Sequence, residues 1–269
     1  MKLIFFLLIV TTVTASHPAL DRLQYGRDWV YQSILINGEE VYKSTCASGG
    51  NKTIEKRYEK IAQVLEQFDR PFTVLDLGAN NGYFSLRILQ DFDAVCVVVD
   101  ETERLTDICT LNTDTNRLIH LRKQFSKDDI KELSKREHFD VVLALHVLHH
   151  VDDWKSWIDT LFQLGSEVII ETPSINDPIN PRPNTKRLAR YLTSLPAGKE
   201  IGRFPRRNDF DHMLWFSPNQ KTSKRFGILP STFLKLSGAY PKRSYVLELN
   251  KEHGTDQWIL QGIDTSQLR

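Results

Sequence analysis

The feature that most constrains this chain is a strand-to-helix turn at residues 74–85, which read Val-Leu-Asp-Leu-Gly-Ala-Asn-Asn-Gly-Tyr-Phe-Ser. An apolar run leads to Asp76, and two glycines follow at Gly78 and Gly82. Because glycine has no Cβ and adopts positive φ readily, this spacing predicts a tight turn that a ligand can approach closely. An amphipathic helix is expected from about Tyr83. Together these features predict an α/β fold with a ligand site at the turn.

Two classes of ligand are bound at turns of this kind. In the dinucleotide fingerprint the strand ends directly in Gly-x-Gly-x-x-Gly, and an acidic residue follows about 20 residues later. Here Asp76 precedes the first glycine, and Asn80 stands where a middle glycine is usual. Asparagine tolerates left-handed backbone geometry better than most residues do. The pattern resembles class I S-adenosylmethionine (SAM) methyltransferases, and the resemblance extends from about Arg57 to Pro173.

Further strands are expected where a doubly wound α/β fold requires them. Residues 94–99 form a continuous apolar run, as expected for a parallel strand that is buried on both faces. Residues 118–121, 139–145 and 167–171 read as the third, fourth and fifth strands. The resemblance implies a seven-stranded sheet of order 3-2-1-4-5-7-6, with the ligand crevice at the carboxyl ends of strands 1 and 4. Its last two strands are expected at residues 244–249 and 257–263.

The resemblance implies that SAM is the cofactor. Asp100 ends the second strand, where a carboxylate suits the ribose hydroxyls of adenosine. A helix predicted at residues 54–68, capped by Thr53, is expected to lie over the cofactor. Arg57 on this helix would then reach the SAM carboxylate, although a solvent-facing arginine is an equal alternative. The residues expected to bind the cofactor are Asp76, Gly78, Ala79, Asn80, Gly82, Tyr83, Asp100, Leu145 and Arg57.

Methyl transfer mainly requires a nucleophile held in line with the methyl group, and a base helps when that nucleophile is a hydroxyl. His146 follows the fourth strand and is expected to be this base, whereas His149 and His150 are expected to pack or to cap a helix. The Asn/Asp-Pro-Pro-Tyr tetrapeptide of amino-methylating nucleic-acid enzymes is absent here. The sequence therefore favours O-methylation of a small molecule or glycan, with RNA as an alternative acceptor.

A basic segment spans residues 182–243, with 14 Lys and Arg residues against three acidic ones. It is expected to be an insertion between strands five and six that recognises the acceptor. Arg203, Arg206 and Arg207 are the residues expected to bind an anionic acceptor. The equal alternative is a solvated basic face. A second class of function is a binding protein that holds a polyanion on a methyltransferase fold without catalysis.

Residues 1–15 are expected to lie outside the folded domain. They contain an apolar run at residues 3–10 and a small-residue sequence that ends at Ala15, which suits a cleaved export signal. A membrane anchor and a cytoplasmic protein are the alternatives. Residues 16–52 are expected to form an N-terminal extension, with a hairpin at Asn37-Gly38, and residues 53–269 the methyltransferase domain. The three cysteines show no metal-ligand spacing, so no metal site is expected.

Overall fold

The computed structural model describes residues 19, 22–23, 30–45, 50–112, 117–173, 183–206, 209–218, 245–250 and 257–261. The predicted export signal, residues 1–15, lies outside this part of the chain. The helices are α2 (Gly50–Leu65), α3 (Tyr83–Asp91), α4 (Glu103–Leu111), α5 (Lys127–Arg136), the short 3₁₀ helix η1 (Leu148–His150), α6 (Trp154–Leu164) and α7 (Pro183–Ser194). The strands are β1 (Ile34–Ile36), β2 (Glu39–Tyr42), β3 (Phe72–Leu77), β4 (Ala94–Asp100), β5 (Leu118–Arg122), β6 (Phe139–Leu145), β7 (Gly165–Thr172), β8 (Gly198–Arg206), β9 (Asp209–Phe216), β10 (Tyr245–Asn250) and β11 (Gln257–Gln261).

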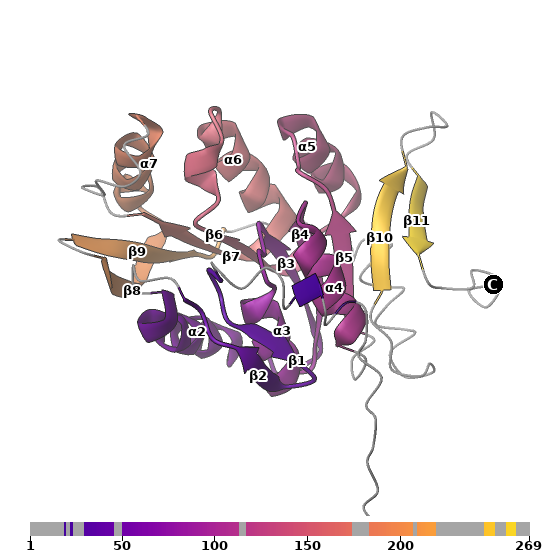
Figure 1. Ribbon diagram of the computed structural model, residues 1–269. Helices are drawn as coiled ribbons and strands as arrows, with labels where there is room; N and C mark the ends of the chain where they lie inside the picture. The colour runs from indigo at the N-terminus through magenta and orange to yellow at the C-terminus, as the bar shows by residue number, and fades with distance from the viewer. Residues whose placement is uncertain are drawn as a thin grey trace, which may run out of the picture.

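A mixed sheet forms the centre of the molecule, and helices cover both of its faces (Figure 1). Seven of its strands run in the order β5-β4-β3-β6-β7-β9-β8. Strands β5, β4, β3, β6 and β7 are parallel to one another, whereas β9 pairs antiparallel with both β7 and β8. This is the order 3-2-1-4-5-7-6 expected from the sequence. The predicted α/β fold class is therefore confirmed.

The two segments expected as the last strands are strands, but their expected position in the sheet was wrong. Positions six and seven of the sheet are filled by β8 and β9, which lie inside the segment expected to be an insertion. β8 escapes recognition because it contains Gly202 and Pro205, and proline is tolerated only where a strand has a free edge. The segments expected as the last strands form β10 and β11 instead. They extend the opposite edge of the sheet, where β10 runs parallel to β5.

Two apolar cores lie on opposite faces of the sheet because side chains alternate along each buried strand. Val74 and Cys96 face α2, α3 and α4, and Leu75 and Val97 face α5, α6 and α7. Figure 1 shows α5, α6 and α7 on one side of the sheet and α2 and α3 on the other. No helix in the described ranges is long and apolar enough to cross a membrane.

The predicted hairpin is confirmed, and it joins the first core. Asn37 and Gly38 have φ of 47° and 88°, as a two-residue hairpin turn requires, and β1 pairs antiparallel with β2. Asn112, at the end of α4, donates from its side-chain amide to the carbonyl of Leu35 at 2.9 Å. The helix expected at residues 54–68 runs from Gly50 to Leu65, so the predicted cap at Thr53 was misplaced.

Asp140 at the start of β6 ties that strand to β3. Its Oδ2 accepts from the backbone N–H of Thr73 at 2.9 Å, and its Oδ1 accepts from Arg70 at 2.6 Å. We expect Asp140→Ala to lower the free energy of unfolding by roughly 2 kcal/mol, because the buried N–H of Thr73 loses its acceptor. Asp93→Ala is the control, since Asp93 pairs with Arg117 at an exposed position and is expected to cost less than about 1 kcal/mol. Urea denaturation measures both, and equal losses would contradict the role given to Asp140.

Candidate active site

The turn after β3 contains three residues with left-handed backbone geometry. Gly78, Asn80 and Gly82 have φ of 69°, 56° and 70°. A Cβ on Gly78 would lie 3.0 Å from Cγ2 of Val147, and one on Gly82 would lie 3.0 Å from Cδ1 of Leu105. Both glycines are therefore required by backbone conformation and by close packing. Asn80 takes the left-handed conformation that the sequence predicted for the place of a middle glycine.

Protein acceptors already engage the backbone N–H groups of this turn. Gly78 and Ala79 both donate to the carbonyl of Val99 in β4, at 2.9 and 3.1 Å. Asn80 donates to Oδ2 of Asp100 at 2.8 Å, and Asn81 donates to the side chain of Gln32 at 3.3 Å. A pyrophosphate on a dinucleotide turn needs free N–H donors. This turn offers none from residues 78–81, so its shape suits a ligand without a phosphate group at this point.

Asp100 braces the turn from the end of β4. Besides accepting from Asn80, its other carboxylate oxygen accepts from the backbone N–H of Thr102 at 3.0 Å. Glu101, the next residue, is exposed and lines the same cavity. Two adjacent carboxylates thus lie at the position where the sequence predicted a ribose contact. Asp100 is the fixed member of the pair, and Glu101 is the more accessible one.

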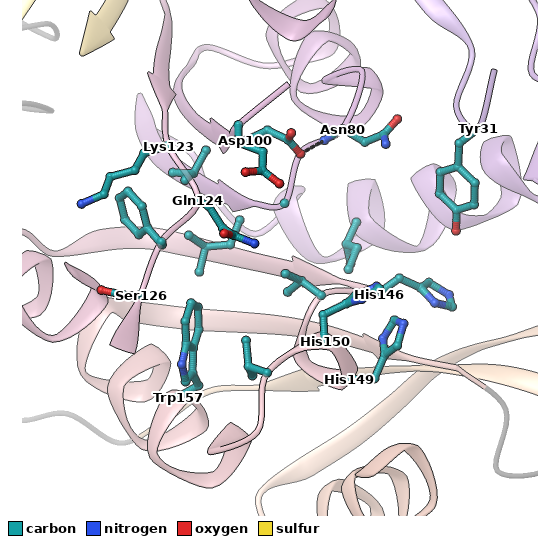
Figure 2. A pocket seen from close by; sticks show the side chains of 18 of the residues that line it. Tyr31, Asn80, Asp100, Lys123, Gln124, Ser126, His146, His149, His150 and Trp157 are labelled. Carbon is teal, nitrogen blue, oxygen red and sulfur yellow. Dashed lines mark hydrogen bonds between the residues drawn. The ribbon is translucent and has the colours of Figure 1, made fainter. Parts of the chain in front are cut away.

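A cavity of about 700 Å³ opens at the carboxyl ends of β3, β4 and β6. One end is lined by Gly78, Asn80, Asp100, Glu101 and Phe125. The other end, called the acceptor end here, is lined by Tyr31, His146, His149 and His150. Figure 2 shows Asn80 and Asp100 hydrogen-bonded at one side of the cavity, with His146 and His149 at the other. The cavity lies where the strand order reverses between β3 and β6, as expected for a doubly wound sheet.

Four of the nine predicted cofactor residues line this cavity, namely Gly78, Asn80, Asp100 and Leu145. The other five are Asp76, Ala79, Gly82, Tyr83 and Arg57, and they lie behind it. Asp76 is 2% exposed and accepts from Ser85 Oγ at 2.8 Å, so it anchors the start of α3 to the strand. Tyr83 is fully buried, with its hydroxyl directed to Glu55 on α2. Ala79 and Gly82 shape the turn through the contacts described above.

Arg57 lies in a buried charge cluster with His146, Glu171 and Asp211. Its Nε lies 3.2 Å from Oε1 of Glu171, and its Nη2 lies 3.1 Å from Oδ2 of Asp211. These ion pairs link α2 to β7 and β9. Arg57 does not line the cavity, and its contact with the SAM carboxylate stays a prediction. Both carboxylates are 1% exposed, so their charges must be balanced inside the protein.

His146 follows β6 with a left-handed backbone, φ 55°, and its N–H donates to the carbonyl of Glu171 at 3.1 Å. Its Nε2 lies 3.4 Å from Oε2 of Glu171 and 3.2 Å from Oδ2 of Asp211. Burial alone would lower the pKa of His146, but Glu171, Tyr31 and Asp211 outweigh it and raise the pKa to about 10. The raised pKa favours the protonated imidazole at neutral pH. That state disfavours a general base, and the base role of His146 stays a prediction.

A family model described as a methyltransferase domain matches residues 51–218. The chain belongs to this methyltransferase family. The match confirms the resemblance to class I SAM-dependent methyltransferases and begins at α2. It ends just after β9, so the family's sheet includes the two strands that the sequence analysis took for an insertion.

The curated relatives are much longer than this methyltransferase. The chain is 25% identical over 158 residues to the O-antigen chain terminator bifunctional methyltransferase/kinase WbdD of Escherichia coli. The alignment covers 56% of this chain and 22% of that protein. A second WbdD sequence from Escherichia coli is 25% identical over 178 residues and covers 60% of this chain and 25% of that protein. The chain thus spans about a quarter of the length of these relatives or less.

Solved structures share the fold. A crystal structure of WbdD superimposes with a TM-score of 0.54 at 21% identity, covering 77% of this chain and 48% of that chain. The N-terminal domain of EvdMO1 with SAH bound superimposes with a TM-score of 0.53 at 12% identity, covering 74% and 95% of the two chains. At these identities the likeness establishes the architecture of the methyltransferase domain and nothing finer.

Arg203, one of the three arginines expected to bind an acceptor, does not line the cavity. Arg203 on β8 is exposed, and its Nε lies 2.6 Å from Oε1 of Glu200. The side chain of Arg206 and the whole of Arg207 lie outside the described residues. Much of the basic segment is α7, β8 and β9, so it is part of the domain itself.

Several cavity residues were missed from the sequence. Tyr31 and Gln32 come from the N-terminal extension. Phe125 lies just before α5, and Trp157 lies on α6. Glu171 could have been found, because it lies at the carboxyl end of a predicted strand next to strand four. Asp211 could not, because β9 was not recognised as a strand.

The pKa of Asp76 gives a pH-dependent test of its burial. Burial raises the pKa of this carboxyl from 3.8 to about 7, and only the Ser85 hydrogen bond opposes that effect. A raised folded-state pKa favours the protonated form, so this group costs stability as pH rises from about 4 to about 7. We expect Asp76→Asn to gain stability relative to wild type on going from about pH 5 to about pH 8. Urea denaturation at both pH values measures this, with Asp93→Asn as an exposed control.

A difference between Asp76→Asn and wild type that stays constant with pH would show that Asp76 is ionised in the folded protein at both values. The same result would place the carboxylate in contact with water or with a cation instead of with Ser85 alone.

Proposed function

We propose that this chain is a SAM-dependent methyltransferase that transfers a methyl group to an oxygen of an acceptor bound at the acceptor end. The braced turn after β3 carries this proposal. SAM has no phosphate group, and the turn after β3 has no free N–H donor among residues 78–81 for one. The carboxylates of Asp100 and Glu101 suit the two ribose hydroxyls, and Phe125 supplies an apolar ring for the adenine.

The methyl group would then lie near Gly78, Leu145 and His146. These residues end or follow β3 and β6, the strands between which the sheet order reverses. The sulfonium is already activated, so the protein needs chiefly to orient the acceptor. Tyr31, His149 and His150 surround the remaining space and are available for that purpose.

The acceptor class we propose is a glycan or another anionic molecule. WbdD is named as a terminator of O-antigen chains, which supports a glycan, although the chain spans only part of WbdD. The excess of Lys and Arg in residues 182–243 supports an anionic group on the acceptor. RNA stays an alternative acceptor.

We also propose that residues 1–15 direct the protein to export or to a membrane. The support is their apolar run and the small residues before Ser16. Expression of the full chain should give either a product that starts near Ser16 or a product in the membrane fraction. An intact Met1 on a protein in the cytosolic fraction would contradict both.

The cofactor site makes a quantitative prediction at Asp100. Its two carboxylate oxygens accept from two different N–H groups, so an asparagine there would direct its NH₂ group at one of them. We expect Asp100→Asn to weaken SAM binding by roughly 1–3 kcal/mol, because the ribose contact and the brace on the turn are both damaged. Isothermal titration calorimetry measures the change.

Glu101→Gln is the matched control for this variant. Glu101 carries the same charge one residue later but is exposed, and its loss is expected to cost less. If Glu101→Gln weakens SAM binding more than Asp100→Asn does, the exposed carboxylate is the ribose partner and Asp100 only shapes the turn.

A further inference from the structure

The buried charge cluster has one negative charge more than its permanent cation can balance. Glu171 and Asp211 each carry one negative charge, and Arg57 carries one positive charge. The residues of the cluster come from α2, from the position just after β6, from β7 and from β9. An unpaired buried charge costs several kcal/mol, so two carboxylates beside one guanidinium favour a further positive charge at this place.

His146 is placed to supply that charge. Its Nε2 is buried between the two carboxylates, at 3.4 and 3.2 Å. A proton on the imidazole makes the cluster neutral, whereas a divalent cation would leave it positive and would lie beside the guanidinium of Arg57. The left-handed backbone of His146 and its N–H bond to the Glu171 carbonyl hold the ring in this position.

The cavity meets the imidazole and not the carboxylates behind it. His146 lines the acceptor end, and neither Glu171 nor Asp211 does. The carboxylates that line the cavity among the described residues are Asp100 and Glu101, which are at its other end. Tyr31 and His149 are further titratable groups beside His146.

We propose that Glu171 and Asp211 are positioning residues that keep His146 as a fixed imidazolium, which selects acceptors whose nucleophilic oxygen is already ionised. A carboxylate or a phosphate oxygen needs no base, so a protonated His146 is no obstacle to its methylation. The imidazolium attracts such an oxygen and directs it toward the cavity. The acceptor class rests on the proposed methyltransferase function, but the charge state of His146 does not.

The charge state is tested by a histidine NMR titration of the isotope-labelled full chain from about pH 6 to about pH 8.5. His146→Asn assigns the resonance, because asparagine tolerates the same left-handed backbone. We expect His146 to keep imidazolium chemical shifts throughout this range. His120 is an internal contrast, since burial lowers its pKa to about 4 and it should keep neutral shifts. Titration of His146 below about pH 7 would overturn the proposal.

Two variants test the cause. Glu171→Gln and Asp211→Asn should each lower the titration midpoint of His146 by at least one pH unit, which is a tenfold loss of proton affinity. Glu200→Gln is the matched control, because Glu200 pairs with His212 on β9 outside this cluster, and it should leave the midpoint unchanged. A one-equivalent change of the His146 resonance on addition of Zn²⁺ would contradict the proposal, since the missing charge would then be a metal ion.

The acceptor class is tested with SAH bound, using inorganic phosphate and acetate as separate probes. We expect at least one of the two anions to shift the resonances of His146 and His149 in a saturable way. In His146→Asn the His149 resonance reports binding, and we expect the affinity for that anion to be at least tenfold weaker. The anion that binds more tightly distinguishes a phosphate from a carboxylate acceptor. If SAH binds and neither anion does, the acceptor class is wrong; if SAH itself does not bind, the methyltransferase proposal fails and the titration result stands.

Discussion

The hydrogen bonds from the turn after β3 to the end of β4 determine where this molecule can bind a ligand. The carbonyl of Val99 accepts from Gly78 and Ala79, and the carboxylate of Asp100 accepts from Asn80. These bonds hold two left-handed residues, Gly78 and Asn80, in place and consume the donors that a phosphate would need. The cavity beside the turn therefore presents carboxylates and apolar surface, which is the chemistry of a nucleoside site without a pyrophosphate.

At the other end of the cavity, charge balance replaces hydrogen-bond geometry as the organising constraint. Arg57, Glu171, Asp211 and His146 join a helix to three strands of the sheet, and most of these side chains are hidden from the cavity. The cluster holds the imidazole of His146 at the edge of the cavity and also holds α2 against β7 and β9. A residue expected to bind cofactor and a residue expected to act as a base thus become parts of one structural unit.

Local patterns in the sequence predicted the parts of the fold that local physics determines. Gly78 and Gly82 are required by the turn, and Asn37-Gly38 forms the predicted hairpin. The edge strand β8 was missed because a proline and a glycine obscure its pattern. The buried charge cluster was missed because it joins residues as distant as Arg57 and Asp211, 154 positions apart, and no local pattern records such a pairing.

The central claim is that the braced turn binds a nucleoside without a pyrophosphate. Isothermal titration calorimetry of the purified chain with SAM, SAH and NAD⁺ tests it most directly. The turn has no free N–H donors for a pyrophosphate, so we expect SAM and SAH to bind at one site each and NAD⁺ not to bind. Binding of NAD⁺ without binding of SAM or SAH would contradict the claim and would show that the turn binds a dinucleotide.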